Sequence, residues 1–262
     1  PDPEANERLR VCEFRDGKIG LSASWYKRLS PFSEDACSKL EMLYEDLAAY
    51  CDFHGIIFQD DGYLNDFEDF HPDAQKEYLK ISGGKLIPFE ELTDEQKNRW
   101  TDRKTDKIIE LTTRLRSRVM FLRPDTLFAR TLYAPVLVDP QSEEWFSQNY
   151  DKTLENYDYT VIMAYPKMEE KFWVRAWLKS LVLKASEKPN GLDKTVFKIQ
   201  AYDWKANEWI SDSKIREWLR CLSAAGAHHT SYYPDSFVQG KPGIKTMIDT
   251  MSKKDFPFEK PK

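Results

Sequence analysis

Short apolar segments typical of β-strands alternate with amphipathic helical segments along most of this chain, and this alternation is the strongest constraint on its fold. The strand-like segments are rich in β-branched and aromatic residues and are bounded by Gly, Asp or Pro. They cover residues 54–59, 126–134, 159–165, 195–202 and 227–233. Strands that alternate with helices pair in parallel through right-handed crossovers. The pattern therefore predicts an α/β fold built on a parallel sheet, with nearly continuous apolar strands buried on both faces.

The helical segments are recognised by apolar residues that recur three and four positions apart. Such a stripe runs from Leu40 to Cys51, and Ser33 stands where it can cap the start of the helix. The same spacing predicts further helices over residues 108–119, 173–181, 215–222 and 243–251.

The position of the polar residues favours a barrel over a doubly wound sheet. No GxGxxG or GxxxxGK[ST] motif follows any strand, so the sequence gives no support for a nucleotide-binding sheet. Polar and aromatic residues gather instead at the carboxyl end of every strand, where barrel enzymes build their sites. We therefore expect residues 1–262 to form a single domain, a (β/α)8 TIM-type barrel.

The number of strands recognisable in the sequence indicates that the chain covers only part of a barrel. Only five strand–helix units are recognisable, whereas a full barrel has eight. Residues 10–26 are typical of a loop excursion or a hairpin rather than of further units. We expect the chain to cover the later strands of a barrel and to lack its first βα units.

Charge and cysteine content narrow the class of protein. A formal net charge of −5 argues against a nucleic-acid binder and suits a neutral or cationic partner. The four cysteines show no CxxC and no metal-ligand spacing, so we expect structural, buried thiols. The four histidines are not placed as a ligand set, and we expect no metal and no cofactor. No apolar run approaches the length of a membrane span.

The stretch HGIIFQDDGYLNDFEDF, residues 54–70, places a pair of carboxylates at the end of a strand. Successive side chains of a strand point to opposite faces, so either Asp60 or Asp61 should face the barrel mouth. Adjacent carboxylates raise each other's proton affinity, and an acid beside a base suits glycoside hydrolysis. We take Asp60 and Asp61 as catalytic candidates and Asp66 and Glu68 as substrate-binding candidates. The alternative is a helix cap followed by a solvated acidic loop.

Aromatic and polar residues at the other strand ends suggest contacts with sugar rings. Aromatic side chains stack on the apolar faces of sugars, while carboxylates and amides bind the hydroxyls. Any one of these aromatic residues is more often part of the core than a ligand contact, but a series of them, each at a strand end beside a polar residue, favours a ligand site. The candidates are Trp25, Tyr26, Tyr63, Arg130, Tyr165, Gln200, Tyr202, Trp204, Tyr232 and Tyr233.

Several segments of the sequence resemble those of a known protein family. The segment RLSPFSEDACSKLEMLYEDLAAYCDFHGIIFQDDGYLNDFED resembles the C-terminal domain of the poly-β-1,6-N-acetyl-D-glucosamine N-deacetylases of biofilm systems, the PgaB/HmsF family. ARTLYA, VIMAYPKMEE, KIQAYDW and SYYPDSF resemble its later strand ends in the same order. The resemblance spans nearly the whole chain, and its first block is the specific part.

The resemblance implies a glycoside-hydrolase-like (β/α)8 barrel that follows a separate deacetylase domain in one periplasmic, outer-membrane-associated polypeptide. It implies binding, and cleavage after partial de-N-acetylation, of poly-β-1,6-N-acetyl-D-glucosamine, with an outer-membrane export porin as a further partner. The family's acidic motif falls on Asp60, Asp61 and Asp66, with Glu68 close by. Deacetylation and its metal are not carried over, because this chain shows no deacetylase metal motif.

Three functions are left open by the sequence. The first is a hydrolase of the partly deacetylated polymer, in which Asp60 or Asp61 is the general acid and a neighbouring carboxylate or the substrate's own N-acetyl group acts as its partner. The second is a non-catalytic module that binds the polymer and guides it for export. The third is an unrelated barrel enzyme acting on another cationic or sugar substrate.

Overall fold

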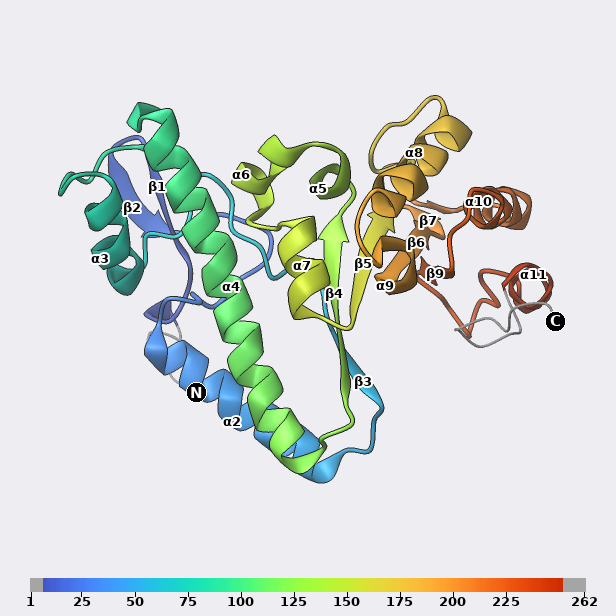
Figure 1. Ribbon diagram of the computed structural model, residues 1–262, viewed down its shortest axis with the longest axis horizontal. Coiled ribbons are helices and arrows are strands. Elements are labelled where there is room, and N and C mark those ends of the chain that lie inside the picture. Colours follow the sequence, from blue (N-terminus) through green and yellow to red (C-terminus); the bar gives the residue numbers. More distant parts are fainter. Residues whose placement is uncertain (1–6, 252–262) are drawn as a thin grey trace. The chain divides into compact units, whose positions relative to one another are not determined.

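The parallel sheet predicted from the sequence is present in the computed structural model, which describes residues 7–251 (Figure 1). Its hydrogen-bonded order is β3-β4-β5-β6-β9, the order of the strands along the chain. The strands are β3 (Gly55–Phe58), β4 (Leu127–Tyr133), β5 (Tyr159–Ala164), β6 (Thr195–Gln200) and β9 (His229–Tyr233). A doubly wound sheet reverses its strand order at a switch point, whereas a barrel keeps it. The α/β fold with a TIM-type strand succession is therefore confirmed.

The burial of strand β3 differs from the burial expected from the sequence. β3 was expected to be buried on both faces, yet Gly55 is exposed and the Ile57 side chain is 53% exposed. Only Phe58 is buried, between the rings of Tyr44 at 6.0 Å and Phe128 at 6.2 Å. The physical reason is position, since β3 stands at one end of the strand order and has a single neighbouring strand.

The chain divides into two compact units, and the first comprises the residues up to 129 together with residues 139–149. It contains the hairpin β1 (Cys12–Arg15) and β2 (Lys18–Leu21), which confirms the excursion expected over residues 10–26. Its helical elements are α2 (Glu34–Tyr50), α3 (Pro72–Ile81), η1 (Phe89–Glu91), α4 (Asp94–Leu122), η2 (Pro140–Ser142) and α6 (Glu143–Phe146). A buried cluster holds the hairpin to α3 and α4, and it includes Phe14, Phe32, Phe70, Tyr78 and Trp100.

Helix α2 begins at the Ser33 cap as expected, but its buried face differs from the predicted stripe. Leu43 and Leu47 of that stripe are exposed, whereas Ala48 is buried as predicted and Ala36, outside the stripe, is also buried. The reason is that α2 packs on α4 largely through small residues and charges. The nearly buried Glu41 accepts hydrogen bonds from Arg114 and Arg118 of α4, the latter from Nε at 2.9 Å.

The second unit comprises residues 130–138 and those from 150 on, and contains the rest of the sheet. β6 pairs in parallel with β5 and with β9. The buried strand residues Ile162, Phe197 and Ile199 form its core with apolar residues of α8 and α10. Its other elements are α5 (Pro135–Val138), α7 (Tyr150–Asn156), α8 (Val174–Ser186), α9 (Gly191–Lys194), the hairpin β7 (Tyr202–Asp203) and β8 (Glu208–Trp209), α10 (Asp212–Ala224) and α11 (Ile244–Thr250).

The thiols are less buried than expected. Cys37 is buried, Cys12 and Cys221 are partly exposed, and Cys51 is exposed at the carboxyl-terminal end of α2. Cys51 leaves the core because it follows the last turn of the helix, where the chain turns away towards β3. Over residues 7–251, no helix is long and apolar enough to cross a membrane.

Candidate active site

Asp60 and Asp61 lie in the turn that follows β3. Asp60 is partly buried and Asp61 is exposed. The turn is closed by the Gly62 amide, which donates to the carbonyl of Gln59 at 3.4 Å. The strand is therefore followed directly by a turn that carries two adjacent carboxylates.

Glu68 has a different role from the one expected. Its side chain is fully buried, and one carboxylate oxygen accepts from the Ser22 hydroxyl and, at 2.6 Å, from Arg28. The other oxygen accepts from the Asn65 amide at 3.1 Å. Because Glu68 has no exposed surface and both oxygens are engaged, it shapes the loop that carries Asp60, Asp61 and Asp66. The expected direct contact between Glu68 and substrate is corrected accordingly.

Asp69 is a second internal carboxylate of the same loop. It accepts from the Ser30 hydroxyl at 2.5 Å, the Cys12 amide at 3.1 Å and the His71 amide at 2.8 Å. Burial raises the pKa of Asp69 above its ordinary value, although these hydrogen bonds oppose the rise. Asp69 thus ties the acidic stretch to the hairpin, whereas Asp66 is only partly buried.

A buried lysine supports the acidic loop from α4. Lys104 is fully buried, and its ammonium donates to the carbonyl of Asn65 at 2.5 Å. Burial lowers the pKa of Lys104 to about 8, while the nearby Glu68 and Asp66 act in the opposite direction. The sequence reasoning missed this residue, because a lysine within a helix is usually solvated and no local pattern distinguishes this one.

Three aromatic candidates of the first unit share one region. The Tyr63 hydroxyl lies 3.0 Å from the hydroxyl of Ser24, and its ring lies 4.0 Å from the Arg28 guanidinium. Ser24 directly precedes Trp25, whose side chain is 92% exposed, and Tyr26, which is also exposed. Tyr63 thus anchors the loop that presents these two rings.

The second unit gathers three of the candidates around a fourth, Trp204. The Trp204 ring is stacked on Tyr165 at 5.7 Å and on Tyr233 at 6.3 Å, and meets Tyr202 edge-on at 6.0 Å. Trp204 is 47% exposed and Tyr233 is 55% exposed, whereas Tyr165 is buried. The strand ends β5, β6 and β9 therefore share an aromatic platform with an open face.

Gln200 and Tyr232 lie at or next to the ends of β6 and β9, and Arg130 lies within β4, all with less exposure than Trp204. The buried Gln200 amide accepts from the backbone of Lys167 at 2.7 Å and donates to the Tyr202 carbonyl at 2.8 Å. Arg130 is buried within β4, and Tyr232 is partly buried in β9. Gln200 and Arg130 are buried and offer no open surface for a direct contact with a substrate, and the bonds of Gln200 hold the loop after β5 to the hairpin that carries Tyr202.

The loop after β5 holds charged groups that the sequence reasoning passed over. The Glu169 amide donates to the Tyr165 carbonyl at 3.0 Å, and burial raises the pKa of the Glu169 carboxyl above its ordinary value. Glu170 forms an ion pair with Lys205 at 2.6 Å, which joins this loop to the hairpin that carries Trp204. The signal was present in the run MEE, which directly follows Pro166 and Lys167.

The sequence comparisons place the chain in a family. A family model described as "Hypothetical glycosyl hydrolase family 13" matches residues 6–233. The chain belongs to this glycosyl hydrolase family. The resemblance found in the sequence is confirmed by the structure of the PgaB (BpsB) glycoside hydrolase domain from Bordetella bronchiseptica, with 33% identity and a TM-score of 0.84. That match covers 97% of this chain and 72% of the Bordetella chain.

Other relatives of this glycosyl hydrolase family member bear on its length and fold. The poly-β-1,6-N-acetyl-D-glucosamine N-deacetylase of Escherichia coli K12 is 33% identical over 243 residues, and the chain spans 36% of that relative's length. Two β-galactosidases, from Marinomonas ef1 and Halorubrum lacusprofundi, match with TM-scores of 0.58 and 0.57 at 10% and 15% identity. At such identities, the two matches show the fold alone.

Proposed function

We propose that this glycoside hydrolase domain binds and cleaves partially de-N-acetylated poly-β-1,6-N-acetyl-D-glucosamine internally along the chain. The observation that carries the proposal is the match to the PgaB glycoside hydrolase domain over 97% of the sequence. The accessible Asp60 and Asp61 at one strand end, and the open Trp204 platform, supply the residue types that such a reaction needs.

In the proposed reaction, Asp60 or Asp61 protonates the glycosidic oxygen as the bond breaks. The second group is the neighbouring aspartate, Asp66 or the substrate's own N-acetyl group, since Glu68 is paired with Arg28. It either attacks the anomeric carbon or activates the water that does so. Water supplies the hydroxyl of the new sugar end and the proton that restores the acid. Glu169 joins the candidates for the acid, because a raised pKa keeps a carboxyl protonated closer to neutral pH.

The substrate would be recognised in two ways, by stacking of sugar rings on aromatic side chains and by attraction between opposite charges. Exposed aromatic rings such as Trp25 and Trp204 offer flat apolar faces to the sugar rings. Deacetylated units carry ammonium groups, which the acidic stretch from Asp60 to Asp66 attracts. We further propose that the domain works in a periplasmic, outer-membrane-associated setting. Its proposed partners are a deacetylase domain in the same polypeptide and an export porin.

The test uses oligosaccharides of the partly deacetylated polymer, with products read by mass spectrometry. Wild-type protein should release shorter oligosaccharides, and Asp60→Asn or Asp61→Asn should slow this by about a hundredfold or more. Calorimetric titration of each variant with the same oligosaccharides should show that binding is retained. Cleavage that persists at the wild-type rate in both single variants would reject the aspartates, and Glu169→Gln then becomes the decisive variant.

The second candidate function is a non-catalytic module that guides the polymer. The nearly full exposure of Trp25, Phe172 and Trp173 favours it, because open aromatic side chains hold a sugar chain without any reacting group. Binding of the oligosaccharides by a folded wild-type protein, with no product after prolonged incubation, would establish this function in place of the hydrolase.

A further inference from the structure

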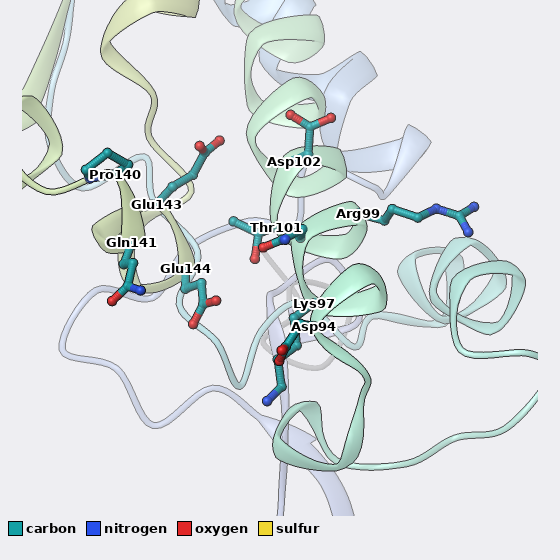
Figure 2. Close-up of a pocket in the computed structure, with 10 residues that line it drawn as sticks. Asp94, Lys97, Arg99, Thr101, Asp102, Pro140, Gln141, Glu143 and Glu144 are labelled. Atoms are coloured by element: carbon teal, nitrogen blue, oxygen red, sulfur yellow. The ribbon is translucent and has the colours of Figure 1, made fainter.

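A hollow of about 720 Å³ lies in the first unit. It opens between the first turns of α4 and the segment that forms η2 and α6, as Figure 2 shows. None of the residues predicted from the sequence lines it. Its lining includes the carboxylates Asp94, Asp102, Glu143 and Glu144 and the cations Lys97 and Arg99. Arg99 points away from α6 and Lys97 lies beside Asp94, so carboxylates outnumber cations in the lining of the hollow (Figure 2).

A buried hydroxyl lies in the wall of this hollow. Thr101 is 5% exposed, and its Oγ1 has no hydrogen-bond partner among the described residues. The side chain projects from α4 towards α6, on the side of Glu144 (Figure 2). A buried polar group without a partner lowers stability, so such groups in native proteins call for an explanation, of which an absent ligand is one.

The carboxylates around the hydroxyl differ in how they are held. Glu143 is fixed, since it accepts from the Thr105 hydroxyl at 2.6 Å and from the Asn149 amide at 2.8 Å. Within residues 7–251, Asp94 and Glu144 form neither an ion pair nor a side-chain hydrogen bond. The hollow thus combines one fixed negative charge, two carboxylates available for a ligand and one hydroxyl in need of a partner.

We propose that this hollow is an accessory binding site for amino-sugar units that carry a free ammonium group. The ammonium would be held by Asp94 and Glu144, and a sugar hydroxyl would pair with Thr101. Among the described residues, no aromatic side chain lines the hollow, so it offers hydrogen bonds and charge rather than a stacking surface, which favours glucosamine over N-acetylglucosamine. The choice of an amino sugar rests on the proposed function, whereas the site itself rests on the hollow.

The probe is the β-1,6-linked glucosamine disaccharide, titrated into the ¹⁵N-labelled chain while backbone amide shifts are followed. The amides of Thr101, Asp102 and Glu144 should move with a saturable dependence on concentration. The N-acetylated disaccharide should bind there at least about tenfold more weakly, because it lacks the charge that the carboxylates recognise. Equal shifts with ethylenediamine at matched ionic strength would show recognition of charge alone and would overturn the assignment to amino sugars.

Variants separate the site from a general charge effect. The double change Asp94→Asn with Glu144→Gln should weaken binding at the hollow by about tenfold or more. Glu95→Gln is the matched control, because Glu95 lies on the same exposed turn of α4 but does not line the hollow. An equal loss in the control would overturn the proposal.

Thr101→Val is a second test of the site, independent of the variants that remove charge. It removes a buried hydroxyl that has no partner, so the midpoint of thermal unfolding should hold or rise while the affinity of the hollow falls. An affinity that is unchanged in this variant would show that the hydroxyl contacts no ligand and would overturn its role.

The same titration keeps this inference distinct from the proposed function. The amides of Tyr165, Trp204 and Tyr233 report the strand-end platform. Shifts confined to those residues would overturn the accessory site and leave the hydrolase standing. Shifts at Thr101 in a protein that cleaves no polymer would support the accessory site and remove the hydrolase.

Discussion

The side chain of Trp204 shows how a single residue can serve both packing and recognition. One part of the ring is held between Tyr165 and Tyr233, and 47% of the side chain remains open to solvent. A ring fixed in this way loses little freedom when a sugar stacks on it, because its orientation is already set.

Trp204→Ala should therefore weaken binding of the glucosamine oligosaccharides by about tenfold or more, and Trp204→Phe should recover part of the loss. Phe121→Ala, at an exposed ring near the end of α4, is the control and should bind as the wild type does. Intrinsic fluorescence titration measures all three affinities. Unaltered affinity in Trp204→Ala would show that the platform packs the protein and does not contact the sugar.

The buried Lys104 should make the stability of the folded protein depend on pH. Its pKa is lowered from 10.5 to about 8 by burial, so the unfolded chain binds more protons than the folded one between these values. Stability should therefore rise with pH across this interval, by up to about 3 kcal/mol from this group alone.

The measurement compares urea unfolding of the wild type with that of Lys104→Met at pH 8, 9 and 10. Methionine cannot titrate and leaves the Asn65 carbonyl without its donor, so the variant should be less stable throughout. The gap between the two proteins should widen as the pH rises. A constant gap would mean that Lys104 keeps an ordinary pKa in the folded protein.

At the scale of the elements, the sequence predicts those with a strong local pattern. All five strands of the sheet and the α2 cap are found where periodicity and Ser33 place them. Helix α3 was missed although Pro72 stands at its first position, because Ala74, Tyr78 and Ile81 give only a sparse apolar stripe. The two-residue strands β7 and β8 are too short for any alternation to be visible.

The candidate site was predictable in part for the same reason. Strand ends locate Asp60, Asp61 and the Trp204 platform, since these positions follow directly from the strands. The exposure of each side chain depends on partners that are distant in sequence. Glu68, for example, is paired with Arg28. Such long-range pairings leave no local signal, and neither does the depth at which Gln200 is buried.

The contact between α2 and α4 yields a prediction about stability. Glu41 is nearly buried and accepts from both Arg114 and Arg118. Glu41→Gln should lower the free energy of unfolding by about 1–3 kcal/mol, because it removes the charge that both arginines address. Glu45→Gln, on the same helix but more exposed, should change it by less than about 1 kcal/mol in chemical denaturation.

The junction between α8 and α9 depends on one glycine. A Cβ at Gly191 would overlap the backbone oxygen of Ala185, a group that no side-chain rotation can move. Gly191→Ala should therefore destabilise the protein by about 1–3 kcal/mol, read as a lower thermal midpoint. Gly20→Ala has open space around the new methyl and should leave the midpoint nearly unchanged.

At the scale of the whole molecule, charge should govern the choice between polymer forms. The chain carries a formal net charge of −5, and each deacetylated sugar carries a positive one. Binding of the deacetylated oligosaccharide should weaken as salt rises from about 0.05 to 0.5 M, because exposed charges are screened over shorter distances. Binding of the fully acetylated form should barely respond, and calorimetric titration at several salt concentrations tests both.

The uneven exposure of the thiols makes this chain convenient for attaching a spectroscopic probe. Desolvation raises the pKa of Cys12 to about 11 and also raises those of Cys37 and Cys221, so these three react slowly with maleimides near neutral pH. Cys51 is exposed at the end of α2. A fluorophore added without any mutagenesis should therefore attach at one known point, and its tumbling rate would then report capture of a long sugar polymer in real time.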